Sequence, residues 1–416
     1  MRIGIPAETC AGETRVAATP ETVKKLLATG HKVSVQAGAG AGASIPDAEY
    51  EAAGATLASA SDIFAQSEIV LKVRAPGAEE LAKLNKGTVL VGLLLPQNAE
   101  LVAAYARQGI VAFSMEKLPR TSRAQAMDVL SSQANIAGYK AVIVAANLYK
   151  RFVPMLMTAA GTVKAARVVV LGVGVAGLQA IATAKRLGAV IEASDVRPAV
   201  KEQVESLGAK FIDVPYETDE EREAAQGVGG YAKPMPPGWL ERQKAEVAKR
   251  VAQADIVITT ALIPGRPAPV LVTEEMVKSM KPGSVIVDLA AEAGGNCPLT
   301  ELNKTVVKHG VTLVGEANLP AAVAADASAL YARNLLNFIN LLCDPKNGGA
   351  VNINREDDII AGSLIAIDGA VVTPARGTPA GAPVKGTPPD TRPSGGLGAA
   401  TLQSSDPSAA KLGEKK

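Results

Sequence analysis

The residues with the clearest chemical meaning form a glycine-rich turn, Gly172-Val173-Gly174-Val175-Ala176-Gly177. The turn follows the apolar run 167–171 and precedes a helical pattern at 178–187. In this setting Gly172 permits a tight turn, Gly174 lets the backbone approach a pyrophosphate, and Gly177 lets the helix pack closely on the strand. Free N–H groups and the dipole at the helix start favour the bound phosphate. The order of elements predicts dinucleotide binding, rather than a glycine-rich turn in an unrelated α/β sheet.

An acidic residue at the end of the next strand selects the cofactor. The strand pattern at 190–194 ends at Asp195, roughly 20 residues past the glycines, where a carboxylate accepts both ribose hydroxyls and repels a 2′-phosphate. Arg197 complicates this, because an arginine there could pair with a 2′-phosphate. The repulsion between a carboxylate and the 2′-phosphate outweighs the attraction of the arginine for that phosphate, so we expect NAD(H) rather than NADP(H).

A second polar cluster lies upstream, at Arg120, Gln125, Asp128 and Ser131. If the segment is helical, Gln125, Asp128 and Ser131 share one face, and Arg120 can fold back to pair with Asp128. One interpretation is a capped, salt-bridged helix start. The other is a polar loop that orients a nicotinamide ribose and carboxamide.

Composition limits the function classes. The chain has 416 residues, enough for more than one domain, and its 43 basic and 41 acidic residues form no long run of one sign. Nothing therefore suggests nucleic-acid binding. Three cysteines in no ligand spacing and two histidines make a metal site improbable and fit a reducing cytoplasm. We find no signal peptide, and the apolar stretch 359–372 is too short and broken to span a bilayer.

Alternating strand and helix patterns predict an α/β fold with two Rossmann-like parallel sheets. The domains we expect are a discontinuous first domain, 1–127 plus 321–378, and an inserted nucleotide domain, 128–320. Long helical patterns at 125–150 and 320–343 should link them, with a cleft between them. The expected strands are 2–5, 32–36, 69–73, 88–95, 110–114, 167–171, 190–194, 209–214, 255–261, 284–289 and 312–315.

Two segments have irregular patterns. The proline-rich end, 379–416, is expected to be a disordered tail. The stretch 216–239 contains Gly229, Gly230 and Tyr231 and is interpreted as a lid over the ligand edge, with a plain surface loop as the alternative.

Residues 1–372 resemble the alanine dehydrogenase and nicotinamide nucleotide transhydrogenase superfamily. The resemblance rests on Gly4-Ile5-Pro6-Ala7-Glu8-Thr9, Glu13-Thr14-Arg15-Val16-Ala17, Gln36-Ala37-Gly38-Ala39-Gly40 and 281–288. An amino-acid dehydrogenase of this family carries Lys-Val-Lys-Glu-Pro where this chain has Lys72-Val73-Arg74-Ala75-Pro76. It also needs a histidine where this chain has Leu94-Leu95-Pro96-Gln97-Asn98. Oxidative deamination needs a general base, whereas hydride transfer between two nicotinamides needs only alignment.

The polar cluster and the Gly230-Tyr231 loop are similar to features of the transhydrogenase branch. The resemblance implies that Gln125 binds the nicotinamide ribose, that Asp128 and Ser131 hold the carboxamide, and that Arg120 organises the loop. It also makes Val175, Gly230, Gln243 and Leu262 candidates for cofactor contact. The full predicted cofactor-binding set is Gly172, Gly174, Val175, Ala176, Gly177, Asp195, Val196, Arg197, Gly230, Tyr231, Gln243 and Leu262.

With one glycine fingerprint, the chain should supply one nucleotide site. The resemblance implies a separately encoded NAD(H)-binding part of an α subunit, without a transmembrane segment of its own, working with a membrane-spanning subunit and an NADP(H)-binding β subunit. It further implies a homodimer, a place on the cytoplasmic side of the inner membrane through these partners, and hydride transfer coupled to proton translocation. The alternatives are an alanine-dehydrogenase-like amino-acid dehydrogenase and a non-catalytic NAD sensor.

Overall fold

The computed structural model describes residues 1–225, 235–262, 266–343 and 349–372. The expected tail, 379–416, and the predicted lid residues Gly230 and Tyr231 lie outside these described residues.

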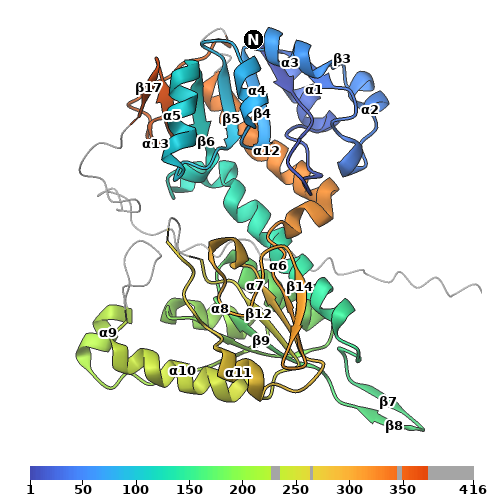
Figure 1. The fold of residues 1–416 in the computed structure, drawn as a ribbon, viewed down its shortest axis with the longest axis vertical. Coiled ribbons are helices and arrows are strands. Elements are labelled where there is room, and N and C mark those ends of the chain that lie inside the picture. The colour runs from blue at the N-terminus through green and yellow to red at the C-terminus, as the bar shows by residue number, and fades with distance from the viewer. Residues whose placement is uncertain (226–234, 263–265, 344–348, 373–416) are drawn as a thin grey trace, which may run out of the picture. The chain divides into compact units, whose positions relative to one another are not determined.

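The first sheet has eight strands in the order β17-β16-β6-β5-β4-β1-β2-β3, parallel except for β16 and β17 (Figure 1). Its strands are β1 (Arg2–Ile5), β2 (Lys32–Gln36), β3 (Thr56–Ala58), β4 (Ile69–Arg74), β5 (Val89–Leu93), β6 (Val111–Ser114), β16 (Leu364–Ile367) and β17 (Ala370–Val371). The helices along this part of the chain are α1 (Pro20–Ala28), α2 (Asp47–Ala52), α3 (Ala60–Gln66), α4 (Ala78–Lys83), α5 (Ala99–Gln108) and α13 (Asp358–Ser363). Strands from both ends of the described chain thus share one sheet.

The second sheet has seven strands in the order β11-β10-β9-β12-β13-β15-β14, parallel except for β14. They are β9 (Arg167–Leu171), β10 (Val190–Ser194), β11 (Lys210–Phe211), β12 (Ile256–Thr259), β13 (Val285–Asp288), β14 (Thr305–Lys308) and β15 (Val311–Val314). Its helices are α7 (Val175–Arg186), α8 (Lys201–Ser206), α9 (Asp219–Ala225), α10 (Pro237–Val251) and α11 (Glu274–Ser279). The predicted fold class, two parallel-sheet α/β units, is confirmed.

Alternate residues of β9 face two cores, as a parallel strand covered on both sides requires. Val168 and Val170 pack in the core formed with α7 and the long helix α6 (Val129–Leu148), whereas Val169 and Leu171 pack in the core with α10 and α11. The continuous apolar run that predicted this strand therefore reflects burial on both faces.

A second long helix, α12 (Ala324–Leu342), follows the second sheet and packs on the first. The Phe338 ring meets Phe113 of β6 edge to face, with centroids 5.4 Å apart. The Tyr331 hydroxyl donates to the Lys72 carbonyl of β4 at 2.8 Å. The amphipathic pattern that predicted this helix is thus explained by its contact with the first sheet.

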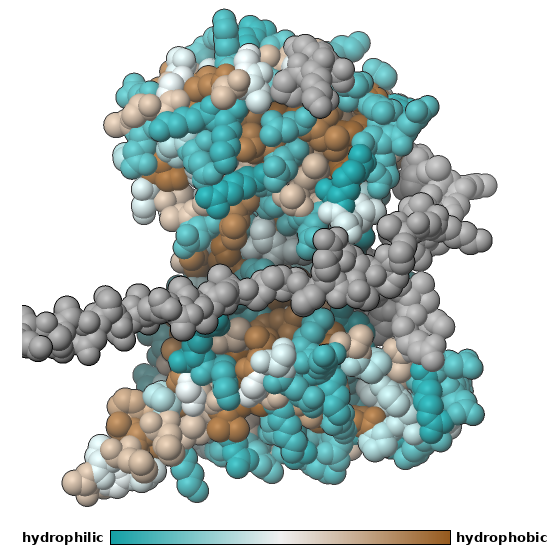
Figure 2. All heavy atoms as spheres, turned by 180° about the vertical axis from the view of Figure 1, so that it is seen from behind, coloured by the Kyte–Doolittle hydropathy of each residue, from teal (hydrophilic) through white to brown (hydrophobic). Residues whose placement is uncertain are grey.

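A small antiparallel hairpin, β7 (Leu156–Thr158) and β8 (Gly161–Val163), extends from the second sheet and is not part of it (Figure 1). Several large apolar side chains at or near it are exposed, including Phe152 at 57%, Met155 at 60% and Met157 at 71%. Figure 2 shows brown and tan residues along this projection. The sequence patterns did not predict it.

Two sequence expectations were wrong. The stretch 216–239 is not irregular throughout, because α9 and the start of α10 lie in it. Thr218 accepts from the Glu221 amide at 3.2 Å, and Asp219, Glu220 and Glu221 occupy the first turn, where negative charge stabilises a helix. The helix expected from 125 begins at Val129, because Asp128 has extended backbone and caps it.

Candidate nucleotide-binding site

The turn between β9 and α7 requires glycine at two positions. Gly172 has φ +93°, and a Cβ there would lie 2.8 Å from Thr260 Oγ1, which itself donates to the Gly172 carbonyl. A Cβ at Gly177 would lie 2.0 Å from the Gly172 carbonyl oxygen, so α7 packs against the turn backbone. The tight turn and the close packing expected of these glycines are therefore present.

The start of α7 is open. Gly174 is the N-cap residue, no side chain caps the helix there, and a Cβ built on Gly174 meets nothing within 4 Å. The first amides of a helix have no intrahelical acceptor, so those of Val175 and Ala176 are suited to an anion. These residues fit a pyrophosphate, although its binding here stays a prediction.

Asp195 lies against the same turn. Its carboxylate accepts from the Val173 amide at 2.7 Å, and its side chain is only 7% exposed. Burial raises the pKa of Asp195, but the Arg197 guanidinium and the Val173 amide outweigh burial and lower it. The group is therefore a carboxylate at neutral pH.

Arg197 occupies both oxygens of that carboxylate. Its Nε and backbone amide donate to Oδ1, each at 2.9 Å, and its Nη2 donates to Oδ2 at 2.9 Å. A ribose that used Asp195 would have to share these oxygens with Arg197. The two residues weighed against each other for cofactor choice thus form one ion pair.

Two further predicted residues lie beside Asp195. Gln243 of α10 donates through Nε2 to Ser194 Oγ at 3.2 Å, which brings it to the end of β10. Val196 packs against a small apolar cluster that includes Trp239, whose indole stacks on Tyr216 with centroids 6.1 Å apart. Both predicted residues therefore adjoin the turn that carries Asp195.

Val175 and Leu262 are exposed apolar residues near this edge, 37% and 51% exposed. The loop that leads to Leu262 is held by Asn296, a fully buried amide that bonds Ala261 N and O and the Pro269 carbonyl. Sequence reasoning missed Asn296, whose partners are distant in the chain.

The polar cluster is arranged differently from the single helical face expected. Gln125 lies in a 3₁₀ segment, Ser122–Met127, and is exposed. Asp128 caps α6 by accepting from the Ser131 amide at 2.9 Å and from its hydroxyl at 2.6 Å. Among the described residues no ion pair joins Arg120 to Asp128, so the capped helix start does not include the salt bridge that one interpretation gave it. The capped helix start is present, and the nicotinamide role stays a prediction.

The arginine that anchors this segment is Arg123, which was not predicted. Its guanidinium pairs with Asp357 at 2.6 Å and also with Asp358, next to the start of α13. A run of two aspartates far along the chain gives no sequence signal of this contact.

A close helix crossing joins α6 to the glycine turn. A Cβ at Gly138 would lie 2.1 Å from the Ala176 carbonyl oxygen, so α6 packs directly on the backbone of the first turn of α7. Gly138 was not predicted; its only signal was a glycine within a long helical pattern.

The first sheet repeats the topology of the second at β1, which lies between β2 and β4 as β9 lies between β10 and β12. Ile5 pairs with Val35, and Gln36 is the next residue along the chain. In the second sheet Leu171 pairs with Ser194, and Asp195 is the next residue. Gln36 also accepts from the Ala7 amide at 3.0 Å, in the same way as Asp195 accepts from Val173. Glu8 comes three residues after Ile5, as Gly174 comes three residues after Leu171, so the two residues occupy equivalent positions.

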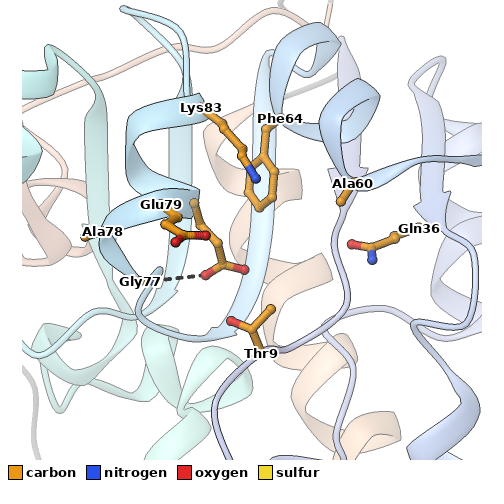
Figure 3. A pocket seen from close by; sticks show the side chains of 9 residues that line it. Thr9, Gln36, Ala60, Phe64, Gly77, Ala78, Glu79 and Lys83 are labelled. Carbon is orange, nitrogen blue, oxygen red and sulfur yellow. Dashed lines mark hydrogen bonds between the residues drawn. The ribbon is translucent and has the colours of Figure 1, made fainter.

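The resulting crevice of the first sheet is unsuited to a pyrophosphate. Glu8 is buried, accepts from the Val73 and Arg74 amides at 2.6 and 3.2 Å, and pairs with Lys72 at 3.4 Å. The adjacent pocket, about 340 Å³, is lined by Thr9, Gln36 and Lys83 together with the acidic Glu79 and Glu80 (Figure 3). Only the second sheet therefore offers the described geometry for a dinucleotide.

Arg74 stands where the amino-acid dehydrogenases named above carry the second lysine of Lys-Val-Lys-Glu-Pro, and its Nε donates to Glu13 at 3.1 Å. Of the two histidines, His31 lies 3.5 Å from the N-terminal amine and His309 pairs with Glu274. Neither is bonded to a residue of the glycine turn in the described structure.

The second sheet and its turn define the class of α/β proteins with a dinucleotide-binding crevice. Family models described as Alanine dehydrogenase/PNT match residues 4–137 with the N-terminal domain and 141–374 with the C-terminal domain, and the chain belongs to this family.

Three similar proteins span both branches. The first part of NAD(P) transhydrogenase subunit alpha from Rhodospirillum rubrum is 55% identical over 90% of this chain and 98% of its own. The crystal structure of transhydrogenase from Sinorhizobium meliloti has a TM-score of 0.78 and 48% identity, covering 90% of this chain and all (100%) of that one. Alanine dehydrogenase of Bacillus subtilis is 31% identical over 89% of this chain and 92% of its own. Identity is thus higher to the transhydrogenase relatives.

Proposed function

We propose that this chain is the NAD(H)-binding component of a proton-translocating NAD(P)⁺ transhydrogenase and passes hydride directly between NAD(H) and NADP(H) bound on a partner subunit. The observation that carries the proposal is the open start of α7 beside the buried carboxylate of Asp195. The 55% identity to a segment of a transhydrogenase α subunit supports the same assignment.

In this proposal the amides at the start of α7 hold the pyrophosphate, and Asp195 holds the adenosine ribose. Gln243, Val196, Val175, Ala176 and Leu262 lie near and contact the cofactor. Arg197 shares the Asp195 carboxylate and is displaced in part when the ribose hydroxyls bind.

The polar loop supplies positioning. Gln125 binds the nicotinamide ribose, Asp128 and Ser131 hold the carboxamide, and Arg120 orders the loop. The cofactor supplies the hydride at C4 of its ring. The chain contributes a fixed ring orientation, because a transfer between two rings depends on contact distance and alignment.

We also infer the assembly. A membrane-spanning subunit and an NADP(H)-binding β subunit complete the enzyme, which lies on the cytoplasmic side of the inner membrane. No helix in the described ranges has the length and apolar character to cross a bilayer. The exposed apolar hairpin around Met155 and Met157 supports a homodimer, because such patches mark interaction sites. The division into 1–127 plus 321–378 and 128–320 is retained as a proposal.

The test mixes the purified chain with the NADP(H)-binding partner, NADPH and an oxidised NAD⁺ analogue whose reduced form has a distinct absorbance. We expect hydride transfer in the wild type and at least a tenfold loss in Gln125→Asn with unchanged NADH binding. Gln66→Asn, an exposed α3 residue, is the matched control and should keep full activity. Absence of transfer while both nucleotides are bound would refute the proposal.

The same experiment separates the alternatives. Reduction of NAD⁺ by L-alanine without the partner would indicate an amino-acid dehydrogenase, against which the Glu13-bound Arg74 argues. Binding of NADH and of the partner without turnover would indicate a sensor.

A further inference from the structure

We infer that Arg15 is a positioning residue that holds α6 in register between the polar loop and the nucleotide turn. The inference rests on the proposed function for its effect on hydride transfer. Arg15 lies in the loop after β1, and its hydrogen bonds to described residues reach neither the glycine turn nor the polar loop.

Arg15 is fixed by a buried carboxylate. Glu13 has no exposed side-chain surface, and it accepts from Arg15 Nε at 2.7 Å and from Arg15 Nη2 at 2.6 Å. Arg74 Nε and Asn318 Nδ2 donate to the same carboxylate, each at 3.1 Å. The planar guanidinium is thereby locked in one orientation.

The remaining donors of Arg15 reach other segments. Nη1 donates to Gln133 Oε1 of α6 at 2.8 Å, and Nη2 donates to Asn318 Oδ1, which follows β15, at 3.2 Å. Gln133 in turn donates to the Ala327 carbonyl of α12 at 3.0 Å. One buried side chain thus joins the loop of the first sheet to α6 and to the segment that leaves the second sheet.

The point of attachment on α6 lies between two functional contacts. Gln133 comes two residues after Ser131 and five before Gly138, where α6 packs on the first turn of α7. At a rise of 1.5 Å per residue, Ser131 and Gly138 are only about 10 Å apart along the helix. A shift of α6 would therefore move Asp128 and Ser131 together with the glycine turn. Misplacement of reacting groups by about 1 Å can cost roughly 100-fold in rate.

A merely structural role would lower folding stability and leave the residual folded protein fully active. The variants Gln133→Glu and Gln133→Leu distinguish the two roles, because both lose the donor to Ala327 and only Glu keeps an acceptor for Arg15. Arg15→Met removes the bridge itself. Arg333→Met is the matched control, because it breaks an exposed ion pair between Arg333 of α12 and Glu21 of α1.

The assays are NADH affinity, followed by fluorescence of the single tryptophan, Trp239, and hydride transfer in the complex well below the melting temperature. We expect Arg15→Met and Gln133→Leu to keep NADH affinity within threefold and to lose at least tenfold in transfer. Gln133→Glu and Arg333→Met should stay within threefold of wild type.

Hydrogen exchange of residues 129–138 gives a readout independent of activity, and we expect it to accelerate in Arg15→Met and not in Arg333→Met. Unchanged exchange in Arg15→Met, or equal losses in Gln133→Glu and Gln133→Leu, would overturn the inference. Lack of transfer by the wild type would instead refute the proposed function and leave the exchange result to decide the role of Arg15.

Discussion

Replacing Glu13 by glutamine should destabilise the protein by an amount that depends on pH. Burial raises the pKa of Glu13, but the hydrogen bonds and charge of Arg15 and the Asn318 amide lower it from 4.5 to about 2. A pKa lowered by roughly 2.5, at 1.36 kcal/mol for each pKa unit, corresponds to about 3 kcal/mol in the free energy of unfolding at pH 7. The Glu13→Gln variant leaves Arg15 buried without its counter-ion, and the figure of about 3 kcal/mol already includes the loss of that interaction.

The direction with pH follows from the lowered value. The folded state holds a carboxylate that the unfolded state protonates near pH 4.5, so the stabilisation is complete above that pH and is lost as pH falls toward 2. Urea denaturation of wild type and Glu13→Gln, followed by circular dichroism from pH 7 to pH 3.5, measures the difference. We expect about 3 kcal/mol from pH 7 to roughly pH 5 and a declining difference below it.

The control is Glu21→Gln, which breaks an exposed ion pair with Arg333 and Lys25. Such surface pairs contribute at most about 1 kcal/mol, so the control should differ little from wild type. A Glu13→Gln loss below about 1 kcal/mol at pH 7, or one that stays constant down to pH 3.5, contradicts the assignment of an ionised, buried Glu13.

Three further outcomes are expected. Gly177→Ala places a Cβ 2.0 Å from the Gly172 carbonyl oxygen, so NADH affinity measured by tryptophan quenching should fall at least tenfold; affinity within twofold would show that the turn adapts. Asp195→Asn removes the charge that repels a 2′-phosphate, so the ratio of NADPH to NADH dissociation constants should fall at least tenfold, and an unchanged ratio would assign discrimination elsewhere. The double variant Met155→Lys and Met157→Lys charges the exposed hairpin, so light scattering should report a monomer with an unchanged melting temperature; a dimer of wild-type stability would exclude the hairpin as the interface.

Local sequence patterns located most strands of the two sheets. The predicted strand 190–194 has the bounds of β10, and the strands 2–5 and 32–36 have those of β1 and β2. These strands carry buried apolar residues between clear turn residues, so burial and the sequence pattern agree. The hairpin β7–β8 was missed because its strands have only three residues each and its apolar side chains face solvent.

Contacts between distant segments could not be predicted in the same way. Arg15 and Gln133 are 118 positions apart, and either residue alone looks like an ordinary polar residue. The Arg197 contact with Asp195 is local, yet the two were expected to compete because spacing does not reveal which rotamer a side chain adopts. A glycine within a long helical pattern can indicate a close contact, but only the structure shows that the contact at Gly138 is with the Ala176 backbone.

The two sheets separate what the fold provides from what the residues provide. In both sheets the turn after one interior strand, β1 or β9, donates a backbone amide to a side chain of the neighbouring strand's end. That acceptor is Gln36 at the end of β2 or Asp195 just after β10. In the first sheet that acceptor is the neutral Gln36, and Glu8 stands in the turn where the second sheet has Gly174. Glu8 is tied to Lys72, which is buried and has Glu80 as its other ionic partner among the described residues. Under the proposed function, the difference between the two sheets therefore lies in side chains and their buried partners rather than in topology.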